Sequence, residues 1–212
     1  RIHESEESRS ATLKKIIVDT IKRRGVLLIP TFAVERTQEL LYEFNHLAEH
    51  GLIPRVNMFL DSPMAIHAND ILNSHPQYYS RKALKLISVG DKLYEFPGLT
   101  ITESRDESKM INEAPRPKVI IAGSGMMNGG RILHHLVRYL GDAKNTLMII
   151  GYQAENTLGR KLYSGEKKVQ VLNEFVDVKA NVVSIGGYSA HGDQNMLMDW
   201  VASSKAKPGS VM

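Results

Sequence analysis

The feature that most constrains the fold is a repeated alternation between short runs of apolar residues and longer stretches with helical periodicity. The apolar runs cover residues 26–29, 56–60, 119–122 and 147–150. Runs that are apolar throughout are typical of strands buried on both faces, as in parallel sheets. The helical stretches cover residues 10–24, 34–50 and 131–140, and a further one begins at Pro63. The alternation predicts βαβ units, and therefore an α/β fold with a mostly parallel β-sheet flanked by helices on both faces.

Two regions depart from this alternation. Residues 78–117 are less regular, and we interpret them as an insertion that contains one strand at residues 99–102. Beyond Gly165, residues 169–171 and 182–185 show the pattern of shorter strands, with no long helix between them. We therefore expect a structural boundary near Gly165. The two expected units are residues 1–165 and 166–212.

Composition excludes several classes of protein. No apolar run approaches the roughly 20 residues that span a bilayer, so we expect no membrane segment. The absence of cysteine excludes disulfides, thiolate zinc sites and cysteine nucleophiles, and it is compatible with a cytoplasmic location. A net charge of +4 is modest, so a polyanionic partner would be held by local clusters of basic residues. Because the chain begins at Arg1 without an initiator methionine, we expect it to be a piece of a longer protein.

Loops that follow the carboxyl ends of parallel strands are the places where such sheets bind ligands. The richest of these loops covers residues 123–131 and contains four glycines within eight positions. Such a loop can turn tightly and direct amide N–H groups at an anion near a helix start. The spacing of its glycines does not match the dinucleotide-binding fingerprint, and a purely structural turn explains the pattern equally well.

Three arginines, Arg36, Arg131 and Arg160, follow predicted strands, where a guanidinium group could take a phosphate in two hydrogen bonds. Taken singly, each is more often part of a surface ion pair. Ser62 follows Asp61 and precedes a proline, so its hydroxyl could lie at the sheet edge, although serine before proline is also an ordinary helix cap.

His191 is the most suggestive histidine, because it follows a predicted strand and small residues surround it. An accessible histidine there suits general acid catalysis, although isolated histidines are usually structural. His134 and His135 are adjacent in a predicted helix and point about 100° apart, so we expect one on the surface and one in the core. His46 and His50 are spaced for one helix face, but without a third ligand we expect no zinc site there.

Five sequence strings, taken together and in this order, resemble the metallo-β-lactamase/β-CASP family of nucleic-acid hydrolases. They are residues 28–39, 60–65, 122–136, 151–153 with 157–159, and 189–191. The resemblance spans nearly the whole chain and is closest to the prokaryotic RNA-processing exonuclease and endonuclease branch, related to the eukaryotic pre-mRNA 3′-end endonuclease. It implies that residues 1–165 form the β-CASP domain. It also implies that residues 166–212 are a partial C-terminal segment of the metallo-β-lactamase αββα domain.

The resemblance implies a zinc-dependent ribonuclease that hydrolyses RNA phosphodiester bonds in RNA processing or decay, with two zinc ions in the parent enzyme. It makes His191 the catalytic residue that lies beside the metals. The implied RNA- and phosphate-binding residues are Arg36, Ser62, Ser124, Gly125, Arg131, Thr157 and Arg160.

The chain departs from the family pattern in its metal ligands. It contains no His-x-His-x-Asp-His string and no Val-His-Gly string, and it ends at Val211 and Met212. We therefore expect no zinc bound to this chain and no activity from it alone. The expected partners are RNA and the missing metallo-β-lactamase portion of the same protein, and we also consider a homodimer.

Two other classes of function are consistent with the residues. The chain could be a non-catalytic nucleotide- or phosphate-binding α/β module, in which the glycine loop holds a small ligand and His191 is structural. It could also serve mainly in protein contacts, including dimerisation.

Overall fold

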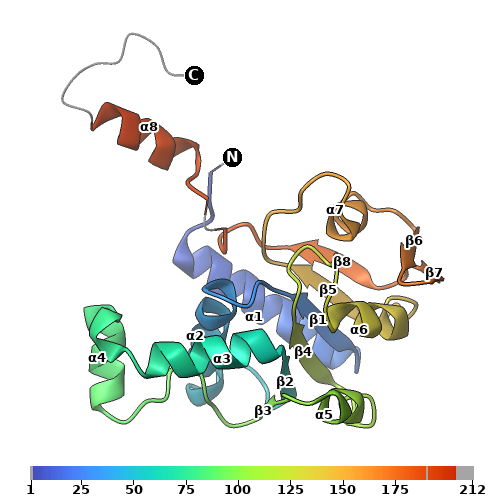
Figure 1. The fold of residues 1–212 in the computed structure, drawn as a ribbon, viewed down its shortest axis with the longest axis horizontal. Coiled ribbons are helices and arrows are strands. Elements are labelled where there is room, and N and C mark those ends of the chain that lie inside the picture. Colours follow the sequence, from blue (N-terminus) through green and yellow to red (C-terminus); the bar gives the residue numbers. More distant parts are fainter. Residues whose placement is uncertain (1, 190, 204–212) are drawn as a thin grey trace.

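The computed structural model describes residues 2–189 and 191–203. Its centre is a six-stranded sheet in which every neighbouring pair of strands is parallel. The strand order is β3 (Leu99–Ile101), β2 (Asn57–Asp61), β4 (Lys118–Ala122), β1 (Val26–Pro30), β5 (Thr146–Ile149) and β8 (Asn181–Ser184). All residues of β1, β4 and β5 are buried, which explains why these strands are apolar except at Lys118 and Thr146, the first residues of β4 and β5. The predicted α/β fold with a mostly parallel sheet is confirmed (Figure 1).

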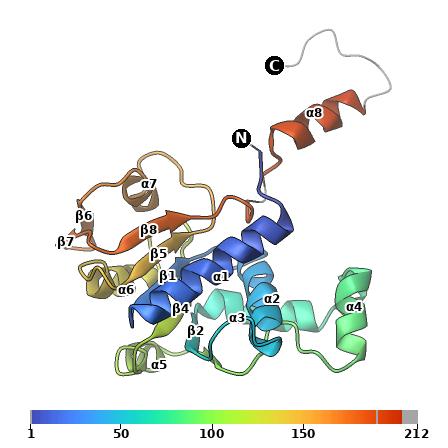
Figure 2. The ribbon, with the colours of Figure 1, turned by 180° about the vertical axis from the view of Figure 1, so that it is seen from behind.

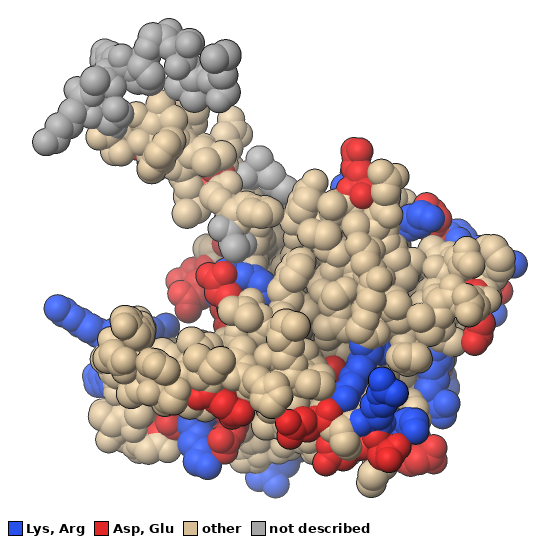
Figure 3. Space-filling view, viewed as in Figure 1, with Lys and Arg blue, Asp and Glu red and all other residues tan. Residues whose placement is uncertain are grey.

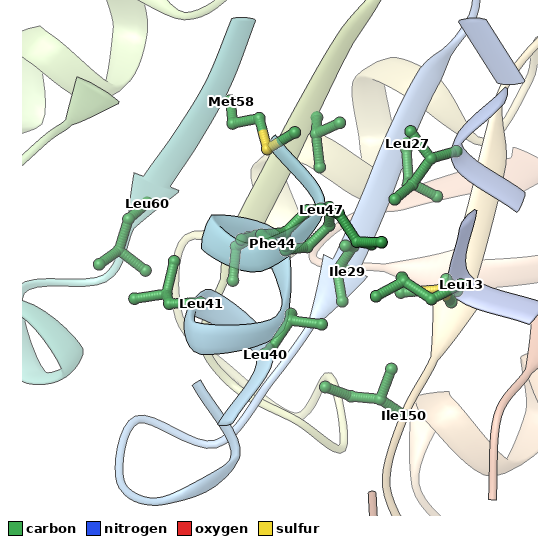
Figure 4. Packing of buried hydrophobic residues seen from close by; sticks show 14 of the residues in the cluster. Leu13, Leu27, Ile29, Leu40, Leu41, Phe44, Leu47, Met58, Leu60 and Ile150 are labelled. Carbon is green, nitrogen blue, oxygen red and sulfur yellow. The ribbon is translucent and has the colours of Figure 1, made fainter. Parts of the chain in front are cut away.

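Helices cover both faces of the sheet and bury two separate cores. Alternate residues of β1 enter different cores: Leu27 and Ile29 face one side, and Leu28 faces the other. The first core receives α1 (Glu6–Lys22), α2 (Arg36–Glu49) and α3 (Pro63–Asn73). Figure 4 shows Phe44 and Leu47 of α2 packed among residues from the strands. The second core receives α6 (Ile132–Tyr139) and α7 (Leu158–Tyr163).

The region that sequence reasoning treated as an insertion contains more helix than expected. Strand β3 is confirmed, but α4 (Arg81–Ser88), the 3-10 helix η1 (Pro76–Tyr78) and α5 (Arg105–Met110) were missed. All three are short and contain no fully buried residue. Helix α4 nevertheless has an apolar face, because Ala83, Leu86 and Ile87 pack against the first core, and sequence reasoning overlooked this signal. A local signal did exist at α5, because Ser104 and Glu107 form a capping box at its start.

The C-terminal part of the chain contributes to the same sheet. Strands β6 (Lys168–Val171) and β7 (Glu174–Asp177) form an antiparallel hairpin that packs on the second core, and β7 was not anticipated. Strand β8 then pairs in parallel with β5 at the sheet edge. Helix α8 (Gln194–Ala202) projects away from the sheet in both views (Figures 1 and 2). The division of the chain at residue 165 stays a prediction.

None of the described helices combines the length and the apolar character that crossing a membrane requires.

Candidate functional site

One cleft, which we call the main cleft, contains the predicted site residues Arg160 and His191 and lies at the carboxyl ends of β5 and β8. It has a volume of about 680 Å³. The loop after β5 and the loop after β8 form its two sides, and α7 adds a third. Strand ends of a parallel sheet lie along one edge, so the loops after Ile149 and Ser184, which begin 35 residues apart in sequence, meet here. The N-terminal segment contributes as well, and the polar and ionisable lining residues include His3, Glu4, Tyr152, Gln153, Arg160, Ser189, His191 and Asp193.

His191 is exposed at the side of this cleft. Its ring lies 5.8 Å from the ring of Tyr152, measured between centroids, and the two planes meet at 65°. Its backbone N–H donates to Ser189 Oγ at 3.3 Å. Within residues 2–189 and 191–203, no hydrogen bond holds either imidazole nitrogen. Ala190, within the predicted 189–191 string, lies outside the described residues, as do Val211 and Met212.

Arg160 brings a positive charge into the same cleft from the first turn of α7. It is exposed, and its guanidinium carbon lies 5.8 Å from the centroid of the Tyr163 ring. No carboxylate in the described part of the chain forms an ion pair with it. Thr157 has a different role: its Oγ1 accepts a hydrogen bond from Arg160 N at 3.1 Å and donates one to Ala154 O at 2.7 Å. The Thr157 hydroxyl therefore caps α7 and is fully used within the fold.

The glycine loop of residues 123–131 connects β4 to α6 and abuts the cleft. Gln153 is buried, and its Nε2 donates to Gly125 O at 3.0 Å and to Gly151 O at 3.1 Å. A Cβ at position 125 would lie 2.7 Å from the ring of Phe32, so glycine allows that ring to cover the loop. The glycine loop and the loop after β5 are therefore fixed to each other by one amide side chain.

Two of the predicted binding residues are serines: Ser124 belongs to this loop, and Ser62 lies next to it. Ser124 Oγ accepts a hydrogen bond from Asn128 N at 3.2 Å. Ser62 precedes α3 and is buried, and a Cβ at Gly123 would lie 3.4 Å from its Oγ. Neither serine lines the main cleft.

Arg36 does not line the cleft. Its guanidinium group instead forms hydrogen bonds and ion pairs with other residues of the protein. Its Nη1 donates to Glu39 Oε2 and to Tyr188 O, the latter at 2.9 Å. Its Nη2 lies 2.9 Å from a Glu35 carboxylate oxygen, and its side chain is only 13% exposed. Arg9, on α1, reaches the other Glu39 oxygen at 2.6 Å. Arg36 thus fastens the segment that leads to His191 onto α2.

Sequence reasoning missed the buried polar cluster next to Arg36. The Tyr188 hydroxyl donates to Glu43 Oε2 at 2.5 Å, and the guanidinium of Arg9 lies 4.5 Å from the Tyr188 ring centroid. Burial, together with the charge of Glu43 and the hydrogen bond to it, raises the pKa of Tyr188. One signal was available, because Glu39 and Glu43 are four residues apart in α2 and therefore share a helix face with Arg36.

Arg131 belongs to a second buried cluster, which is centred on Asp61. The fully buried Asp61 carboxylate accepts hydrogen bonds from Arg131 Nη1 and His135 Nε2 at 2.7 Å each. It also accepts from Ser108 Oγ at 2.7 Å and from Thr102 Oγ1 at 2.8 Å. Burial by itself raises the pKa of Asp61, but the four hydrogen bonds outweigh it and lower that pKa to about 2. The cluster joins β2 and β3 to α5 and α6.

The expectation for the paired histidines is confirmed, because His134 is exposed and His135 is buried. Within residues 2–189 and 191–203, no group of three or more histidine, aspartate and glutamate side chains is arranged to hold a metal ion. The donor set for a zinc pair is therefore not present in this part of the chain.

Two family models match the chain. Residues 37–162 match the Beta-Casp domain, and residues 176–212 match the Zn-dependent metallo-hydrolase RNA specificity domain.

The curated relatives are longer proteins. Ribonuclease TTHA0252 of Thermus thermophilus is 40% identical over 188 residues, which are 88% of this chain and 43% of the relative. Transcription termination factor FttA of Methanosarcina mazei is 33% identical over 205 residues, or 94% of this chain and 32% of the relative. An RNase J-like protein of Methanocaldococcus jannaschii is 34% identical over 185 residues, or 87% and 42%. The chain spans less than half the length of each of these relatives, and it belongs to the metallo-β-lactamase/β-CASP ribonuclease family.

Proposed function

We propose that this chain is the β-CASP part of a metal-dependent ribonuclease that hydrolyses RNA phosphodiester bonds in RNA processing or decay. The observation that carries the proposal is the cleft at the ends of β5 and β8, in which His191, Arg160 and Tyr152 meet. Two relatives are named a ribonuclease and an RNase J-like protein, and residues 176–212 match a family model named as an RNA specificity domain; both names support the proposal.

The three cleft residues suit three parts of RNA binding. Arg160 has no internal carboxylate partner in the described residues, so its guanidinium group is available to a phosphate. His191 can hold a proton next to that phosphate and donate it to the leaving oxygen. Tyr152 is 55% exposed and offers a ring face on which a base can stack.

The other predicted binding residues divide into two groups. We place Ser124 and Gly125 in contact with RNA, because the glycine loop abuts the cleft through Gln153. We assign a positioning role to the residues whose polar groups are already held within the fold or buried. These residues are Arg36, Ser62, Arg131 and Thr157.

The residues described here do not fit the zinc pair that the family implies, so we place the zinc ligands in the remainder of a longer protein. The relatives are more than twice as long as the matched segment, which supports this division. Inactivity of the isolated chain, a cytoplasmic location, the boundary at residue 165 and a homodimer stay predictions.

The test is the salt dependence of RNA binding by the longer protein that contains this chain. Arg160→Ala should weaken binding of single-stranded RNA by roughly tenfold and lower the slope of log affinity against log salt by about 0.7. Arg81→Ala removes an exposed arginine from α4 and should change neither quantity. An Arg160→Ala protein with unchanged affinity and slope would contradict the proposal.

His191 gives an independent test. His191→Ala should abolish cleavage while RNA binding is retained, since the proposed role is proton transfer. Tight binding of a mononucleotide, with no preference for longer RNA, would instead favour the non-catalytic nucleotide-binding module.

A further inference from the structure

A second pocket, which we call the α5–α6 pocket, lies outside the main cleft and has a volume of about 580 Å³. It lies between the two helices after which it is named and shares no lining residue with the cleft. Its lining residues are Arg105, Ser108, Lys109, Asn112, Arg131, His134 and His135. Lys and Arg side chains gather beside α5 and α6 on this face of the molecule (Figure 3).

The lining of this pocket is strongly one-sided in charge. Three of its side chains are cationic, two are histidines, two are neutral hydrogen-bonding groups, and none is a carboxylate. Arg105 is exposed and has no carboxylate partner in the part of the chain that the structure describes. Lys109 contacts Asp106 at 2.9 Å, but both side chains are more than 70% exposed, so this pair is easily exchanged for another anion.

The floor of the pocket is rigid. The His135 side chain is 4% exposed and is held by Asp61 at 2.7 Å. Arg131 is held by Asp61 and by two backbone carbonyls, Thr102 O at 2.9 Å and Glu103 O at 2.6 Å. The donors and charges at the floor are therefore fixed before a ligand arrives, which lowers the entropy cost of binding.

The glycine loop connects the pocket to the cleft. Gly125 lies at the cleft end of this loop, where Gln153 holds it, and Arg131 lies at the other end, in the pocket. A strand of nucleic acid that follows the loop passes from one to the other. We propose that the α5–α6 pocket holds a phosphate of the RNA strand beyond the cleft, an inference that rests on the proposed function.

RNA suits this position better than an acidic peptide does, because its phosphates repeat regularly along the strand that already occupies the proposed cleft. The lone cation Arg105 and the exchangeable Lys109 would contact the phosphate. Arg131 and His135, which are already bonded to the Asp61 carboxylate, would form the fixed floor beneath it.

The experiment compares the longer protein with two double variants that remove the same charge. Arg105→Ala with Lys109→Ala empties the pocket of its exposed cations. The control is Lys14→Ala with Lys15→Ala on α1, which lies on the other face of the sheet. Like the pocket variant, it removes one cation that is paired with an aspartate, Lys15, and one, Lys14, that has no carboxylate partner among the described residues. The probes are a short single-stranded RNA that fills only the cleft and a longer one that also reaches the pocket.

The pocket variant should bind the longer RNA roughly tenfold more weakly than the wild type, with a salt slope lower by about 1.4, as expected for two lost phosphate contacts. Its affinity for the short RNA should be unchanged. The control variant should bind both RNAs as the wild type does.

Three outcomes would overturn the inference. They are an unchanged affinity of the pocket variant for the longer RNA, an equal loss in the control variant, and competition by a polyglutamate peptide as effective as that by RNA of equal charge. The Arg160→Ala variant distinguishes failure of the pocket assignment from failure of the proposed function. If Arg160→Ala still weakens binding of the short RNA, only the pocket assignment fails.

Discussion

Arg131 and Arg160 occupy similar places in the sequence, since each follows a strand of the same sheet and lies at the start of a helix. Their surroundings differ completely. Arg131 is 18% exposed and bonds a fully buried carboxylate, whereas Arg160 is exposed in the cleft and pairs with no carboxylate of the described residues. The comparison teaches that a strand-end position does not by itself make an arginine available to a ligand. An arginine next to a buried carboxylate pairs with that carboxylate and is not available to a ligand.

The sharpest way to test this comparison is to truncate both arginines. Arg131→Ala should lower the free energy of unfolding by about 3 to 5 kcal/mol, because it leaves Asp61 charged and buried with a cationic partner removed. Arg160→Ala should change that free energy by less than about 0.5 kcal/mol, as expected for an exposed side chain. Urea unfolding monitored by circular dichroism measures both. Similar losses in the two variants would show that burial of the ion pair does not distinguish them.

Lowering the pH should destabilise the wild-type protein through the same Asp61 cluster. The folded-state pKa of Asp61, about 2, is lower than its ordinary value of 3.8. Its stabilising effect is therefore complete above about pH 4 and is lost as the pH falls through 2. The shift corresponds to roughly 2 kcal/mol.

Stability curves between pH 2 and 5 check this prediction. Asp61→Asn should flatten the acid dependence by that amount. Asp106→Asn is the control, since the pKa of Asp106 is also lowered, through Lys109, but its side chain is exposed. A curve for Asp61→Asn as steep as that of the wild type would contradict the assignment.

Arg36 should give an effect between those of Arg131 and Arg160, because it is held by carboxylates that are themselves partly exposed. Arg36→Ala should lower the free energy of unfolding by about 1 kcal/mol. Because Arg36 holds Tyr188 O near His191, the variant should also cleave RNA more slowly in the longer protein while its salt slope for binding stays unchanged. A lower slope would show instead that Arg36 contacts phosphate.

The sheet was predictable from the sequence because burial on both faces makes β1, β4 and β5 apolar beyond the first residues of β4 and β5. Helices α4 and α5 were not predicted. Helix α5 has only six residues and no buried one, and α4 has only eight residues, although its apolar face was a signal that sequence reasoning overlooked. The hairpin strand β7 was missed for a related reason, since only Val176 of its four residues is buried.

The candidate site was predictable to the extent that it follows from strand ends. This rule correctly brought Tyr152, Arg160 and His191 to one edge of the sheet. It could not show which arginines are engaged inside the protein, because Arg131 finds its partner Asp61 70 residues away in the sequence. Nothing in the local pattern around Arg131 encodes that partner.

The pairing of β8 with β5 has a practical consequence for anyone who shortens the protein. Truncation after residue 165 would remove β8 from the edge of β5 and leave the backbone groups of residues 146–149 that face β8 without partners. It would also remove Ile185 and Tyr188 from the hydrophobic core. Such a shortened chain presents a bare strand edge, which is a template for aggregation. Expression boundaries should therefore keep residues 166–189 attached.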